Sequence, residues 1–284
     1  MIRFPISDKC RVFLAALAAG QAFISSAFAD RDVFLANALG QVAIGSASDT
    51  SPADPDLTTR VFERVLVPGF PPFDPADYGL DEPGFFALPT GDAELPAGVS
   101  ALPPNADVTV NLTAFTIAGD TDTLFYWSGA GVVSFEPITA SQPGVSLVLD
   151  PNPIGSTGAN GGADIHPAYR LDKSGVGVPA DGVYLISPTA SVAGLADSER
   201  FFTVFLADVL VADEDAAEEL LEGLEMGQPI FAGKDFGFFA EASAFVEANL
   251  VVPEPTSLIL AGLACAGLGL FVARRPSALR REQR

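Results

Sequence analysis

The stretch VTVNLTA, residues 108–114, has an apolar side chain at every second position, with threonine or asparagine between them. This period of two predicts a strand with one buried and one exposed face. Seven other runs of β-branched and aromatic residues have similar lengths, and we expect them to be strands too: residues 33–44, 60–67, 124–127, 131–135, 145–149, 182–187 and 201–206. Eight short strands separated by Pro and Gly turns predict a mainly β fold, an antiparallel β-sandwich.

A helical period replaces the strand pattern near residue 213. Apolar side chains recur at helical spacing from Ala216 to Leu224, and acidic side chains take the opposite face. We therefore expect a helix that has Asp213 as its N-cap and ends at Gly227. A second helix is predicted over residues 238–250, with a terminal strand as the alternative. The β-sandwich is thus expected to carry one or two C-terminal helices.

The charge of the chain is concentrated in its central part. Residues 30–249 contain 33 acidic and seven basic side chains, a net charge of −26, whereas the whole chain has −21. Such a domain repels anionic polymers, so no nucleic-acid partner is expected. Cys10 and Cys265 both lie outside this region. A disulfide, a thiolate zinc site and a cysteine nucleophile are therefore excluded from it.

Residues 1–29 have the pattern of a secretory signal peptide. Basic residues precede an apolar run over residues 12–22, and the segment closes with Ala27 and Ala29 in an Ala-x-Ala pattern. Signal peptidase cleaves after such a pattern. A buried N-terminal helix is the alternative. We expect export of the chain, with the acidic domain over residues 30–250.

The C-terminal segment has three parts. A Pro-rich linker (residues 251–257) precedes an apolar segment (residues 258–273) and a basic tail (residues 274–284) with five arginines, Arg274 and Arg275 first. About 16 to 18 apolar residues in a helix span about 24 to 27 Å, which suffices for a thin bilayer. The arginines fix the tail in the cytoplasm. We therefore predict a transmembrane helix that anchors the acidic domain outside the cytoplasm.

The linker, apolar span and arginines occur in a diagnostic order. Val252, Pro253, Glu254 and Pro255 come first, and the whole tail resembles the PEP-CTERM sorting signal of exported bacterial proteins. The resemblance implies that an exosortase, a membrane-embedded transpeptidase, recognises the tail and cleaves near Pro-Glu-Pro. It also implies a membrane-anchored precursor that later reaches the cell surface or the extracellular space. A plain single-pass anchor is the alternative.

Several short stretches of the body are similar to a group of exported PEP-CTERM proteins of unassigned biochemistry. These stretches are residues 32–35, 40–41, 126–129, 164–172, 182–185 and 197–202. The resemblance implies a β-sandwich with a His-containing strand, a Gly-x-Tyr-Leu strand and a Ser-x-x-Phe strand. Members of that group often have two or three neighbouring histidines, whereas this chain has His166 alone.

Catalytic chemistry has little support in the sequence. A Ser-His-Asp hydrolase would need His166 as its base, with Asp164 two residues away, but no nucleophile motif accompanies them. Glycoside hydrolysis needs paired carboxylates in an aromatic cleft, and the chain has one Trp and four Tyr. We therefore expect that the protein is not an enzyme.

Metal binding is the better chemical alternative. Calcium takes oxygen ligands, which Asp120 and Asp122 offer, as does the glycine-rich loop with Asp150, Asn152, Asn160 and Asp164. Turn formation explains the same residue types. A zinc site would combine His166 with Asp164 or Asp172.

These observations predict a non-catalytic cell-surface or extracellular-matrix protein that requires no cofactor. A calcium- or carbohydrate-binding module that contacts an exopolysaccharide is the alternative, and a secreted hydrolase is the third interpretation.

Overall fold

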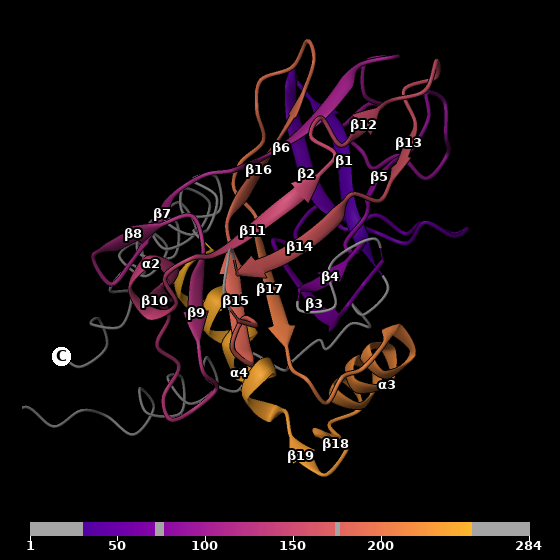
Figure 1. The fold of residues 1–284 in the computed structure, drawn as a ribbon. Coiled ribbons are helices and arrows are strands. Elements are labelled where there is room, and N and C mark those ends of the chain that lie inside the picture. Colours follow the sequence, from indigo (N-terminus) through magenta and orange to yellow (C-terminus); the bar gives the residue numbers. More distant parts are fainter. Residues whose placement is uncertain (1–30, 72–76, 174–176, 252–284) are drawn as a thin grey trace, which may run out of the picture.

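The computed structural model describes residues 31–71, 77–173 and 177–251, whose arrangement is shown in Figure 1. These residues form a mainly β structure, as predicted, with several sheets and a few helices. Among them, no helix has both the length and the apolar character needed to cross a membrane. The predicted signal peptide, the Pro-Glu-Pro motif, the transmembrane segment and the basic tail lie outside the described residues.

The largest sheet has eight strands. In spatial order they are β10 (Glu136–Pro137), β9 (Phe125–Trp127), β15 (Gly182–Ile186), β17 (Phe202–Ala207), β3 (Val61–Pro68), β4 (Tyr78–Leu80), β14 (Ala168–Lys173) and β11 (Val145–Asp150). Neighbouring strands of this sheet are antiparallel except β17 and β3, which are parallel.

Four smaller sheets complete the β structure of the described residues. One has the order β13 (Ala163–Ile165), β5 (Phe85–Ala87), β1 (Asp32–Ala38) and β2 (Gln41–Ala47), and another has β12 (Gly155–Ser156), β6 (Asp107–Leu112) and β16 (Pro188–Val192). The two-stranded sheets are β7 (Phe115–Ile117) with β8 (Asp120–Asp122), and β18 (Ile230–Phe231) with β19 (Lys234–Asp235). Strands β1 and β5 are parallel.

The two parallel pairs correct the prediction of a wholly antiparallel fold. Strands β1 and β5 are separated by β2, β3 and β4, and strands β3 and β17 lie even farther apart in sequence. Long connections of this kind allow either strand direction. An alternating pattern identifies a strand and its buried face, but it does not identify the partner or the direction.

A shared core lies between the eight-stranded sheet and the two larger of the small sheets. Buried side chains from all three sheets form one contact cluster, for example Val33 of β1, Val108 of β6 and Phe205 of β17. Full burial of such a side chain contributes roughly 1.5–3 kcal/mol. This packing fixes the position of β1 and β5 relative to the large sheet.

Two helices cover the opposite face of the large sheet (Figure 1): α3 (Glu214–Glu225) and α4 (Gly237–Asn249). The N–H of Ala216 donates to the Asp213 side chain, so the predicted N-cap is confirmed. The helix at α4 is also confirmed, and the alternative of a terminal strand there is wrong. A short helix, α2 (Ile138–Ser141), was not predicted.

Two of the eight predicted strands are wrong. Residues 33–44 form the β1–β2 hairpin instead of one strand, because Leu39 and Gly40 have φ of 54° and 93° and reverse the chain. Residues 131–135 form no strand; Gly131 has φ of 74°, and β9 pairs with β10 instead. The other six predictions correspond to β3, β6, β9, β11, β15 and β17.

Candidate functional site

The candidate site lies where one end of β5 meets its two neighbouring strands. Phe85 is paired with β1 on one side and with β13 on the other. One position before Phe85, the same registers bring Gly84 between Asp32, the first residue of β1, and His166, which follows β13. Side chains alternate along a strand, so Asp164 and His166 lie on the same face.

Three carboxylates surround the imidazole of His166. Its Nε2 lies 3.0 Å from Oδ1 of Asp164 and 3.9 Å from Oδ2 of Asp32. Its Nδ1 lies 3.1 Å from Oε1 of Glu82, in the connection between β4 and β5. We call Asp32, Glu82, Asp164 and His166 the histidine cluster.

Gly84 holds two of the carboxylates through its backbone. Its N–H donates to Oδ1 of Asp32 at 2.8 Å and to Oε2 of Glu82 at 2.9 Å. A Cβ at this position would lie 2.6 Å from Cε1 and 2.7 Å from Nδ1 of His166. It would also lie 2.8 Å from Oδ1 of Asp32. The cluster therefore requires glycine here, because only glycine lets the backbone approach this closely.

Asp32 is the buried member of the cluster, with a side chain that is only 5% exposed. Its Oδ1 accepts the Gly84 hydrogen bond, but its Oδ2 is buried and has no hydrogen-bond partner. Burial, followed by the charge of Glu82, raises the pKa of Asp32 to about 7. Burial acts to lower the pKa of His166, but the charges of Asp32 and Glu82 outweigh it and raise this pKa.

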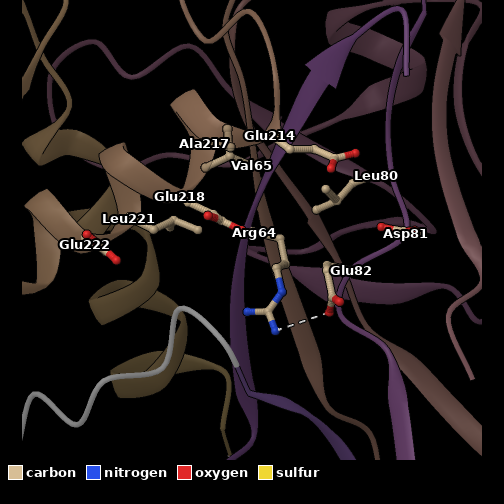
Figure 2. Close-up of a pocket in the computed structure, with 10 residues that line it drawn as sticks. All are labelled: Arg64, Val65, Leu80, Asp81, Glu82, Glu214, Ala217, Glu218, Leu221 and Glu222. Carbon is tan, nitrogen blue, oxygen red and sulfur yellow. Dashed lines mark ion pairs between the residues drawn. The ribbon is translucent and has the colours of Figure 1, made fainter. Parts of the chain in front are cut away.

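Arg64 of β3 supplies the neighbouring positive charge. Its side chain is 3% exposed, and Nη2 lies 3.8 Å from Oε2 of Glu82. The guanidinium also donates to the backbone carbonyls of Arg31 at 2.6 Å and Glu63 at 2.7 Å. These bonds fix the guanidinium in the interior, where it faces Glu82 (Figure 2).

A pocket of about 300 Å³ adjoins this ion pair (Figure 2). Arg64 and Glu82 line one part of it, and three acids from α3 line another: Glu214, Glu218 and Glu222. Burial and the nearby Asp81 carboxylate raise the pKa of Glu214. The pocket is therefore strongly acidic, and it shares Glu82 with the histidine cluster.

The structure brings together only some of the residues proposed from the sequence. Asp164 and His166 are in contact, as the zinc and hydrolase interpretations require. Asp172 lies on β14, where its Oδ2 is 3.4 Å from Nη2 of Arg170. Asp172 is therefore engaged elsewhere, and the zinc alternative that uses it is not supported.

Three of the predicted calcium ligands, Asp122, Asn152 and Asn160, make hydrogen bonds within the protein. Oδ2 of Asp122 accepts hydrogen bonds from the N–H and the hydroxyl of Thr139, at 3.2 and 2.8 Å. Asp120 and Asp122 lie on β8, well separated from β13 in Figure 1. In the glycine-rich loop, the Asn152 amide donates to a backbone carbonyl, and Asn160 accepts from a backbone N–H. The Asn160 contact, with Gly162 two residues later, is the local bond that turn chemistry predicts, whereas the contacts of Asp122 and Asn152 join distant segments.

Sequence reasoning missed the roles of Asp32, Glu82, Gly84 and Arg64. Asp32 belongs to residues 32–35, one of the stretches that carry a resemblance, and the Glu-Pro-Gly sequence of residues 82–84 is typical of a turn. A useful signal is the acidic residue directly before the apolar run of residues 33–36. The approach of this residue to His166 follows from the β1–β5–β13 register, which the local pattern does not give.

The cluster offers one imidazole nitrogen and two carboxylates on one side, and a third carboxylate at the other ring nitrogen. Such groups can hold a divalent cation or share protons. Comparison with protein families, curated proteins and solved structures finds no match to this chain.

Proposed function

We propose that this chain is an exported, non-catalytic cell-surface or extracellular-matrix protein, built on a β-sandwich body and processed at both ends. The observation that carries the proposal is the fit between the folded body and the two predicted processing points. Among the described residues, the first strand begins at Asp32, shortly after the Ala27 and Ala29 cleavage pattern. The last helix in the same part of the chain ends at Asn249, shortly before the Pro-Glu-Pro motif.

The packing at the end of the body supports the same proposal. Leu250 and Val251 still contact the apolar cluster between the helices and the large sheet. Val252 and Pro253 come next, and a proline cannot continue the interior of a helix. Helix α4 thus ends before the recognition motif, which lies outside the described residues.

The surroundings of His166 support a non-catalytic role. Nδ1 faces Glu82, and Nε2 faces Asp164 and Asp32. A serine hydrolase needs one ring nitrogen to take the proton of the nucleophile and the other to contact an acid. Because both nitrogens of His166 face carboxylates, neither is directed at a hydroxyl nucleophile.

The test is replacement of Pro253, Glu254 and Pro255 by alanine in cells that contain an exosortase. We expect the variant to stay at full length in the membrane fraction, while the wild-type chain is shortened and leaves that fraction. Replacement of Thr256 and Ser257 by alanine is the matched control and should leave processing unchanged. Normal processing of the Pro-Glu-Pro variant would contradict the proposal.

A further inference from the structure

We propose that Asp32, Asp164 and His166 bind a divalent transition-metal cation, with zinc as the best fit, and that Glu82 orients the imidazole. The proposal goes beyond export and sorting, because it assigns a ligand to the folded body itself. It rests on four features of the site: ligand spacing, an unsatisfied buried oxygen, the support of the ring and the ligand types.

The spacing of the three ligand atoms suits one ion. One atom from each of the three side chains lies within 4.8 Å of the other two. Zinc bonds of about 2.0 to 2.2 Å place ligand atoms on one ion about 3 to 4 Å apart. The separations of Nε2 from the Asp164 and Asp32 oxygens, 3.0 and 3.9 Å, fall in this range.

The buried oxygen of Asp32 needs a positive partner. Oδ2 has no hydrogen-bond partner, although the side chain is only 5% exposed. A buried carboxylate oxygen without a partner is costly, whereas a coordinated cation offsets that cost directly. Oδ2 is also the Asp32 atom that lies 3.9 Å from Nε2 of His166. The unsatisfied atom thus lies beside the imidazole nitrogen that would bind the ion.

The residues behind the ligands have the arrangement that metal sites use. Oε1 of Glu82 lies 3.1 Å from Nδ1 of His166, so it can accept the Nδ1–H proton and leave the Nε2 lone pair for the ion. The Gly84 N–H holds Oδ1 of Asp32 at 2.8 Å, which directs Oδ2 toward the imidazole. The carboxylate–imidazole pair therefore selects one tautomer and one ring orientation.

The ligand types select the class of metal. Calcium and magnesium prefer oxygen ligands alone, whereas an imidazole nitrogen with two carboxylates suits zinc and neighbouring transition metals. Three protein ligands leave a fourth position for water or an outside group. The Asp164 side chain is 61% exposed and that of His166 is 33% exposed, so this position is open to solvent.

The experiment measures zinc binding by the full-length chain in detergent after removal of metal with a chelator. Cys10 and Cys265 are replaced by serine in every sample, so that thiolates cannot bind the ion. Competition with a chromophoric chelator gives the stoichiometry and the affinity. We expect one zinc ion per chain, and an affinity that falls by more than about 100-fold in Asp164→Asn and in His166→Gln. Such a loss exceeds the 10- to 100-fold cost of an outer-sphere partner.

Asp172→Asn is the matched control, because this carboxylate lies near the site in sequence but pairs with Arg170. The affinity of the Asp172→Asn variant for zinc should equal that of the parent chain. Absence of zinc binding by the parent chain would overturn the proposal, as would unchanged affinity in both ligand variants. Thermal unfolding of the metal-free samples shows that the variants fold, so that a loss of affinity is assigned to the ligands. Processing of the C-terminal tail is not needed for any of these results.

Discussion

Adjacent residues of β3 place opposite charges on the two faces of the large sheet. Arg64 lies on the face that packs against the small sheets, together with Phe62 and Leu66. Glu63 lies on the helix-covered face, together with Val61 and Val65. Arg64 donates to two carbonyls and faces Glu82.

Glu63 has different surroundings. Burial raises its pKa; a hydrogen bond with Ser243 opposes the shift, while the charges of Glu247 and Glu225 add to it. On the Arg64 face, carboxylates meet an imidazole, a guanidinium and a backbone N–H in fixed positions. Acidic residues are buried on both faces of β3. Those on the Arg64 face contact these donors in fixed positions, and the contacts, not the number of acids, make that face a candidate site.

The largest loss of stability is expected when Arg64 is replaced by an uncharged residue. Arg64→Met removes the guanidinium beside Glu82 and the hydrogen bonds that it donates to two backbone carbonyls. The guanidinium is 3% exposed although Glu82 is 36% exposed, so we expect the lost hydrogen bonds of this buried charge to cost about 3 kcal/mol of unfolding free energy. Urea unfolding measures this change. Arg170→Met, which removes the partially exposed pair with Asp172, should cost about 1 kcal/mol or less. Equal losses of unfolding free energy in the two variants would contradict the expectation that Arg64 contributes more to stability than Arg170.

A smaller loss is expected from Gly84→Ala, which tests the close backbone approach. The new Cβ would clash with His166 and Asp32, and overpacking of this kind costs about 1–3 kcal/mol. Zinc affinity should fall as well, because the two ligands must separate. Gly91→Ala is the control: its φ of +85° strains any side chain, but open space surrounds it. If only stability fell and zinc affinity stayed unchanged, Gly84 would have no role in the cluster.

Glu82→Gln tests whether zinc affinity depends on the histidine cluster or on the acidic pocket, because Glu82 belongs to both. Glutamine still accepts a hydrogen bond from Nδ1–H but without charge, so we expect about a 10-fold loss of zinc affinity. Glu218→Gln, on the α3 side of the pocket, should leave the affinity unchanged. If both variants lost affinity equally, general negative charge would explain binding better than the ordered cluster.

The smallest change in stability is expected from replacement of Glu63, which lies on the helix-covered face. The folded state raises the pKa of Glu63 above its ordinary value, so the folded state binds more protons and stability falls as pH rises past that value. Glu63→Gln removes this loss and should raise the unfolding free energy at pH 7 by about 1 kcal/mol. The gain should vanish below about pH 4, where the glutamate of both states is protonated. Exposed Glu219→Gln serves as the control, and a loss of stability in Glu63→Gln at pH 7 would contradict this account.

The sequence predicts much of the secondary structure, because local periods are physical signals. The alternation in residues 108–114 identifies β6, and the apolar spacing after Asp213 identifies α3. Strand pairing is not local: the parallel contact of β1 with β5 crosses more than one intervening strand. The sequence pattern does not predict the hairpin turn at Leu39, because a leucine with positive φ has no sequence signature.

The same limit explains which site residues were found. Asp164 and His166 are two positions apart, so local spacing suggests their contact. Asp32 and Gly84 reach His166 only through the register of three strands. The unsatisfied oxygen of Asp32 depends on tertiary burial, which neither residue type nor spacing reports.

X-ray absorption at the zinc edge tests the central claim most directly, with the zinc-loaded full-length chain in detergent and its cysteines intact. We predict a first shell of nitrogen and oxygen atoms at about 2.0–2.2 Å, with an imidazole outer-shell signal that disappears in His166→Gln. A sulfur shell at about 2.3 Å, or an imidazole signal that His166→Gln does not remove, would contradict the assignment of zinc to the histidine cluster.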